Sequence, residues 1–369
     1  MSSELERRLG GMLAEAPEPE RGAGEEALRR ALRALHPSAS PHRGLRTAVL
    51  VFAAAVALLA IAAGSLAAAG ALHVSFGAKA KHRPPATTEL TLPNGANGIA
   101  AIVDGRLSVV VKGGFRLQGQ EATAVALSPH ALYIAAGIGR SLVAMAPDGR
   151  RAWSHPAGGK VVAASWAPDG LEIAYVVRHG RRLELHLIYG NGRKDTTIDH
   201  SVRAVRPSWR ADSLAFAYVA AGGKAIVYDV GHTSRRVVAS RAAGDVRHVA
   251  FAPGGKLLAL ATSTAVGIVR PGLNELADRG RIGGIGWTGR WLAVVHEGSH
   301  PVVLLTASPQ LGQLRPGGTI DVLGAEGHGI ALAVSTSDAT RVLAAASGDE
   351  LRTVMRLPPH TSVRDLQLG

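Results

Sequence analysis

A short unit that recurs after residue 97 restricts the fold more than any other feature of this sequence. Its clearest copy begins at Trp166 and reads Trp-Ala-Pro-Asp-Gly-Leu-Glu-Ile-Ala-Tyr-Val-Val. An apolar strand ends in the aromatic residue, Pro168 to Gly170 reverse the chain, and a second apolar strand follows. Glycine supplies the positive φ that such a turn needs, and proline fixes the φ of its own position. The unit therefore predicts a β-hairpin.

Weaker copies of this hairpin recur along the chain, and further apolar strands follow them. The copies begin at Leu127, Trp209, Phe251, Trp287 and Val334. Third strands are expected at Leu142–Met145, Leu185–Tyr189 and Ile226–Val230, and the best fourth strand is Arg236–Ala239. A repeat of four short antiparallel strands every ~35 to 50 residues is typical of β-propeller blades.

The two ends of the repeat region predict how the ring closes. Ile99–Val103 and Leu107–Val111 form a hairpin that no first strand precedes, and Val363–Gly369 resembles the first strand at Val246–Phe251. We therefore expect the C-terminal strand to complete the opening blade, which removes two exposed edges. First strands should end near Leu127, Trp166, Trp209, Phe251, Trp287, Val334 and Leu368. The expected fold is an all-β, seven-bladed β-propeller, with six blades as the alternative if one weak unit is a loop.

The unit at 166–170, with its Ile-Ala-Tyr second strand, resembles the WD40-like repeats of TolB-type bacterial β-propellers. The resemblance covers roughly residues 97–369, the expected propeller domain. The sequence does not contain the Gly-His…Trp-Asp signature of eukaryotic WD repeats. It implies a propeller fold and a binding or scaffold role. It implies no particular ligand, because propellers carry many unrelated functions.

The chain before the propeller contains a long apolar segment. Residues 47–72 carry no charge, and about 20 residues of helix already cross a bilayer. We expect an uncleaved transmembrane helix there, with a cleaved signal peptide as the competing interpretation. Arginines before the helix favour a cytoplasmic N-terminus. Residues 1–46 are then a cytoplasmic segment with short amphipathic helices, either awaiting a protein partner or solvated, and 73–96 are a linker.

Composition and motifs give little support for an enzyme. The chain has no Cys, which excludes disulfides and thiolate zinc sites. It contains no nucleophile elbow, His-Glu-x-x-His pair or phosphate-binding glycine loop. The histidines at 179, 186, 200 and 232 have no evident paired ligands and are interpreted as surface or capping residues. We therefore predict no catalytic site, no metal site and no cofactor.

Basic residues recur at one position of the repeat, in a chain whose net charge is +13. They stand six residues before the end of a first strand, or four residues before it in two units: Lys160, Arg203, Arg247, Arg281, His328 and Arg364. First strands line the channel of a propeller, so these side chains should surround one mouth and bind an anion. The alternative is that strand starts are simply exposed in an arginine-rich chain. The sequence has no run of basic residues interleaved with aromatic residues, the pattern that would predict binding of nucleic acid.

These features favour a membrane-anchored, extracytoplasmic propeller that acts as a non-enzymatic binding or scaffold module of the bacterial cell envelope. Its partner would be a protein or an anionic envelope component. The layout also resembles membrane-bound anti-sigma-like proteins, so the alternative is a transmembrane signalling regulator. In that case the propeller senses and the N-terminal helices bind a cytoplasmic protein.

Overall fold

The computed structural model describes residues 92–93, 96–112, 115–239, 244–270, 273–289, 291–296, 302–306, 311–314, 316–326, 329–346 and 351–369. The predicted cytoplasmic segment 1–46, the predicted transmembrane helix 47–72 and most of the linker 73–96 lie outside these residues. Within the described part, no helix has the length and apolar character needed to cross a membrane.

The described strands form seven four-stranded antiparallel sheets. The opening sheet contains β1 Gly98–Val103, β2 Arg106–Val111 and β3 Phe115–Glu121, together with the closing strand β28 Val363–Leu368. The next three are β4 Val125–Leu127, β5 Ile134–Ile138, β6 Ser141–Met145 and β7 Arg151–Pro156; β8 Lys160–Trp166, β9 Glu172–His179, β10 Arg182–Tyr189 and β11 Thr196–Asp199; and β12 Ser208–Trp209, β13 Ala215–Val219, β14 Ala225–Asp229 and β15 Ser234–Ala239.

The last three sheets are β16 His248–Phe251, β17 Leu258–Ala261, β18 Ala265–Arg270 and β19 Leu273–Arg279; β20 Ile282–Thr288, β21 Trp291–His296, β22 Val302–Thr306 and β23 Leu311–Leu314; and β24 Thr319–Glu326, β25 Gly329–Ser335, β26 Thr340–Ala346 and β27 Arg352–Leu357. One short 3₁₀ turn, Pro129–Ala131, follows β4.

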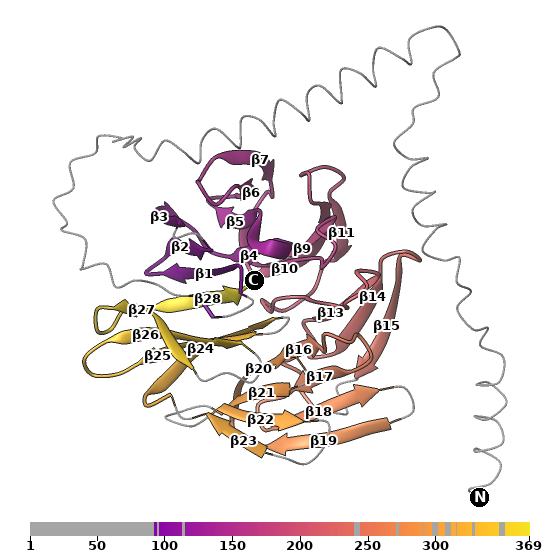
Figure 1. Ribbon diagram of the computed structural model, residues 1–369. Coiled ribbons are helices and arrows are strands. Elements are labelled where there is room, and N and C mark those ends of the chain that lie inside the picture. The colour runs from indigo at the N-terminus through magenta and orange to yellow at the C-terminus, as the bar shows by residue number, and fades with distance from the viewer. Residues whose placement is uncertain are drawn as a thin grey trace, which may run out of the picture. The chain divides into compact units, whose positions relative to one another are not determined.

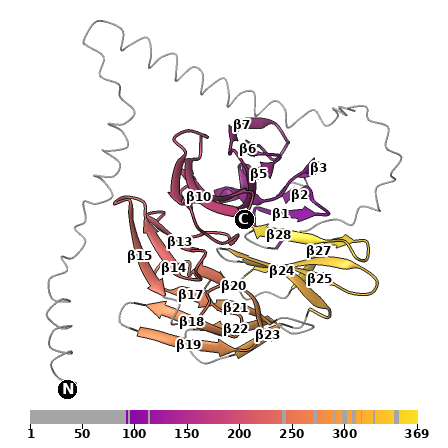
Figure 2. The same cartoon turned by 180° about the vertical axis from the view of Figure 1, so that it is seen from behind.

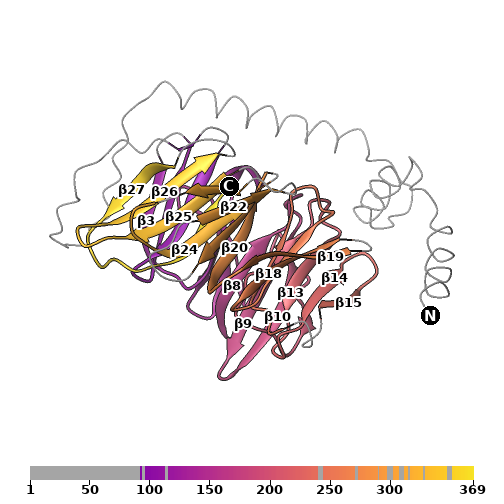
Figure 3. The same cartoon turned by 90° about the horizontal axis from the view of Figure 1, so that it is seen from below.

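The seven sheets surround a common centre (Figures 1 and 2). The first strand of each sheet contacts the first strands of both neighbouring sheets, and β28 contacts both β24 and β4, so these inner strands form a closed ring. Figure 3 shows the sheets packed side by side, for example β24 beside β20. This arrangement is that of a β-propeller, as the sequence predicts.

The closure between the two ends of the propeller is confirmed. β28 pairs antiparallel with β1, with Leu366 opposite Ala101 and Leu368 opposite Ile99. The backbone N–H of Asn97 also donates to the carbonyl of Gly369 at 2.6 Å. The closing strand is buried on its core-facing side, where Val363, Leu366 and Leu368 are at most 4% exposed.

The unit around Val334 differs from the expectation by one strand. Val334 lies in the second strand of its sheet, β25, opposite Ile320 of the true first strand β24. Val342, expected in a second strand, lies in the third strand β26. The apolar run at 330–334 is followed by Ser-Thr-Ser-Asp and a further apolar run, so it has the pattern of a first strand although it occupies the second position.

The turn after β8 shows why the recurring unit reverses the chain. Gly170 has φ +77°, and its N–H donates to the carbonyl of Ala167 at 2.9 Å. The Asp169 carboxylate accepts the N–H of Leu171 at 2.9 Å, which mimics a backbone turn. The end of each first strand is thereby held at a defined position near the centre of the ring.

Neighbouring sheets are joined through small aliphatic side chains and a few large anchors. The indole N–H of Trp209 donates to the carbonyl of Ser165 at 3.1 Å, and that of Trp287 donates to Ala250 at 2.9 Å. Each bond connects one first strand to the preceding one. Both Trp side chains are buried, so their hydrogen bonds add to the packing that fixes the ring.

Candidate functional site

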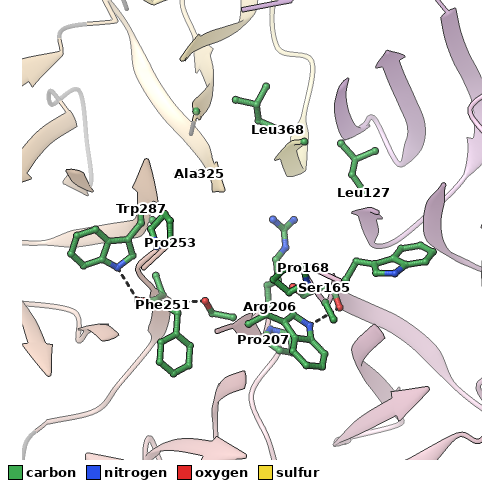
Figure 4. Close-up of a pocket in the computed structure, with 18 of the residues that line it drawn as sticks. Leu127, Ser165, Pro168, Arg206, Pro207, Phe251, Pro253, Trp287, Ala325 and Leu368 are labelled. Atoms are coloured by element: carbon green, nitrogen blue, oxygen red, sulfur yellow. Dashed lines mark hydrogen bonds between the residues drawn. The ribbon is translucent and has the colours of Figure 1, made fainter. Parts of the chain in front are cut away.

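A cavity with a volume of about 740 Å³ lies at the centre of the ring (Figure 4). All seven sheets contribute to its wall, mostly through residues at or just after the ends of their first strands. Leu127, Phe251, Ala325 and Leu368 supply apolar surface from four different sheets.

The recurring turn places prolines around the same cavity. Pro129, Pro168 and Pro253 each follow the end of a first strand, and Pro207 precedes β12. Because proline offers no backbone N–H, these positions add apolar surface without leaving unpaired donors. The wall therefore presents more apolar than polar surface.

One ion pair crosses this apolar space. Arg206, in the segment before β12, pairs through a terminal guanidinium nitrogen with the carboxylate of Asp365 on β28. Its other terminal nitrogen donates to the carbonyl of Leu366 at 3.3 Å. Around the ring, two sheets on one side and three on the other separate the sheet next to Arg206 from the sheet that contains Asp365, so Arg206 reaches across the cavity (Figure 4).

The partners of this ion pair are themselves held in place. Asp365 also accepts the backbone N–H of Val125 on β4 at 2.9 Å. The side chains of Arg206 and Asp365 are 23% and 21% exposed. His248 lines the same cavity, and burial together with the charge of Arg247 holds its pKa below the usual value. It is therefore neutral near pH 7 and adds no charge to the cavity.

The predicted basic residues lie at the other ends of the first strands. Lys160 is the first residue of β8, Arg247 and Arg281 directly precede β16 and β20, and Arg364 is the second residue of β28. None of the five basic residues that the structure describes lines the central cavity.

One of these basic residues is already paired with an acidic side chain. Arg203 forms an ion pair with Asp245 at 2.6 Å. His328 lies outside the described residues. An anion site at that mouth stays a prediction.

Replacing Arg203, Arg247 and Arg281 together by Ser tests this mouth. If the residues act jointly, the triple variant should no longer bind an anionic polymer such as polyphosphate. Binding of that polymer by the unmodified chain should weaken with rising salt. A matched control, Arg150→Ser with Arg151→Ser and Arg193→Ser, removes the same charge from exposed positions at the turns after third strands. Equal loss in both triple variants would contradict a localised site.

The histidine interpretation is right for one residue and wrong for another. His232 is exposed and caps Asp229, with 3.0 Å between Nδ1 and the carboxylate oxygen. His186 is buried, with only 8% of the residue exposed. It lies beside His179 and Glu184, whose donor atoms fall within 4.8 Å of one another. The signal in the sequence was Glu184-x-His186, because alternate residues of a strand share one face.

No protein-family model matches the chain, and no curated protein sequence matches it. Solved structures do. The β-propeller domain of Cps50 (Swd1) from Myceliophteria thermophila has a TM-score of 0.50 and 13% identity, and the match covers 66% of this chain and 92% of that one. The chain has a β-propeller fold. TolB from Acinetobacter baumannii is similar at TM-score 0.49 and 16% identity over 74% of this chain and 66% of that one.

BamB from Moraxella catarrhalis is a third similar propeller, with a TM-score of 0.45 and 12% identity over 67% of this chain and 91% of its own. At such identities the comparison establishes the fold and assigns no ligand. The function of this propeller has to be inferred from its own cavity.

Proposed function

We propose that the propeller is a non-enzymatic binding module that holds an extended segment of a partner protein in its central cavity. The observation that supports this most is the composition of that cavity. Its wall combines apolar side chains from several sheets with prolines next to the first strands, and one ion pair crosses it.

The size and chemistry of the cavity favour a peptide segment over an anionic polymer. A volume of about 740 Å³ accommodates several side chains of a bound segment. Leu127, Phe251 and Leu368 offer contacts to apolar side chains. The positive charge of Arg206 is balanced by Asp365, so the cavity offers no net charge to a polyanion.

A binding role uses the ion pair of Arg206 and Asp365 as it stands, as a fixed polar contact for a bound segment, and requires no proton transfer. In the same proposal, residues 47–72 tether the propeller to a bacterial membrane, which would restrict its partners to the extracytoplasmic side.

Site-specific photocrosslinking tests the binding role. A photoreactive phenylalanine replaces Ala204, an exposed residue that lines the cavity, in the full chain within native membranes. We expect a discrete protein adduct that is lost when Pro168→Asp, at an exposed residue of the cavity wall, is added. The matched control places the same group at Ala152, which is exposed on β7 and does not line the cavity. Adducts of equal pattern and yield from both positions, or none from position 204, would refute the proposal.

A further inference from the structure

A second group of chemically active side chains lies on the sheet formed by β8 to β11, away from the central cavity. His179 ends β9, and Glu184 and His186 lie on β10. The hairpin register pairs His179 with Arg182 and His186 with Tyr175. Because side chains alternate along a strand, Tyr175 and His179 share one face of the sheet with Glu184 and His186.

The donor atoms on this face lie at distances suited to a shared ion. Glu184 Oε2 is 3.7 Å from His179 Nε2 and 3.7 Å from His186 Nε2. Two ligands of a tetrahedral Zn²⁺ ion, each about 2.0–2.1 Å from it, lie roughly 3.4 Å apart. Small side-chain adjustments would therefore bring all three atoms to bonding distance of one ion.

The orientation of His186 is fixed by a carboxylate behind it. Its Nδ1 lies 3.1 Å from Asp195 Oδ2, and the other oxygen of Asp195 accepts the hydroxyl of Tyr175 at 2.8 Å. Asp195 accepts a hydrogen bond from Nδ1–H of His186, so the lone pair of the neutral ring lies on Nε2. A carboxylate that holds a histidine in this way is the usual second partner of a metal ligand.

No described residue donates a hydrogen bond to the lone pair of the His186 imidazole. His186 Nε2 is buried and has no hydrogen-bond partner among the described residues. The side chain is 10% exposed, and an unpaired polar atom in such a position normally costs free energy. A metal ion at this atom would remove that cost.

We propose that His179, Glu184 and His186 bind a divalent transition-metal ion, with Zn²⁺ the best fit. Two imidazoles and one carboxylate match the ligands of zinc, whereas Ca²⁺ and Mg²⁺ prefer sites built from oxygen alone. His200 Nδ1 lies 3.2 Å from the second oxygen of Glu184. Its side chain is 76% exposed, so it can rotate to supply a fourth ligand.

The bound ion would fasten the outer part of this sheet. His179 and Glu184 belong to one hairpin, and His200 follows the outermost strand β11. Asp195 also contacts His155 of β7 in the neighbouring sheet, with 3.4 Å between Nε2 and the carboxylate. The site therefore connects three strands of one blade directly and the next blade through Asp195.

Titration of the full chain with Zn²⁺ alone, followed by calorimetry, tests the proposal. We expect one ion per chain at the highest-affinity site, and binding at least about 100-fold weaker in the variant that combines His179→Ala with Glu184→Gln. Asp195→Asn should weaken binding by about 10- to 100-fold, because His186 is no longer held. The control His232→Ala removes an exposed histidine that pairs with an aspartate elsewhere and should bind as the unmodified chain does.

Thermal unfolding provides a second readout. Zn²⁺ should raise the melting temperature of the unmodified chain and of His232→Ala, but not that of the double variant. If the double variant fails to fold, the single variant His179→Gln, at a side chain that is 34% exposed, replaces it. The proposal is overturned if the unmodified chain binds no Zn²⁺, or if the ligand variants bind it as tightly as His232→Ala.

Discussion

Replacing Leu366 with Asp is expected to open the ring and unfold the propeller. Leu366 is 1% exposed and packs in the cluster that joins β28 to β24–β27 and β1. The substitution removes a buried apolar side chain and places a carboxylate without a partner among apolar neighbours. Truncating such a leucine alone costs about 2–5 kcal/mol, and the buried charge adds several more. Urea denaturation followed by circular dichroism measures the loss.

The matched control for this substitution lies on the same strand. Arg364 is exposed, so Arg364→Ser should change the free energy of unfolding by no more than about 0.5 kcal/mol. If Leu366→Asp unfolds at the same urea concentration as Arg364→Ser, β28 does not close the ring in the way described.

Loss of the ion pair across the cavity should have the second largest effect. Arg206→Ala leaves the carboxylate of Asp365, 21% exposed, without its cationic partner. Breaking one side of a buried pair costs about 3–5 kcal/mol, and partial exposure reduces the expected cost here to about 2 kcal/mol. In Asp365→Asn combined with Arg206→Ala, part of that cost should be recovered, because no charge is left unpaired. Chemical denaturation of Arg206→Ala, of Asp365→Asn alone and of the double variant gives the coupling energy.

An exposed pair of the same chemistry provides the control. Arg356 and Asp338 are joined at 3.2 Å, with side chains 63% and 68% exposed. Such surface pairs contribute little, so Arg356→Ala should cost well under 1 kcal/mol. A cost for Arg206→Ala no larger than that for Arg356→Ala would show that the pair across the cavity has no special role.

The local features of the fold could be read from the sequence because short-range chemistry determines them. The Pro168–Gly170 turn, the first strands that end at Trp166, Trp209 and Phe251, and the pairing of β28 with β1 follow from turn residues, strand periodicity and edge pairing. The unit around Val334 failed the same reasoning. Its second and third strands are both apolar and are joined by a polar Ser-Thr-Ser-Asp turn, so the pattern predicts them as the first and second strands.

The sites depend on contacts between segments distant in sequence, which periodicity does not report. The spacing rule that found Lys160 and Arg281 predicts which end of the first strand a residue occupies. It does not show that the central cavity lies at the opposite end of the first strands, or that Arg206 crosses it. Asp195 likewise approaches His186 only because the chain turns back after β10. The histidine group was therefore missed although its residues are close in sequence.

The pairing of Ile99 with Leu368 has a kinetic consequence. The first hairpin of the propeller cannot obtain its inner neighbour until the six intervening sheets have been synthesised, so its edge stays open during that time. Contacts between such distant residues form slowly, because a long loop has to close before any stabilising contact is made. Newly made chains should therefore depend on chaperones, or on delivery across a membrane before folding, during the interval between synthesis of β1 and synthesis of β28.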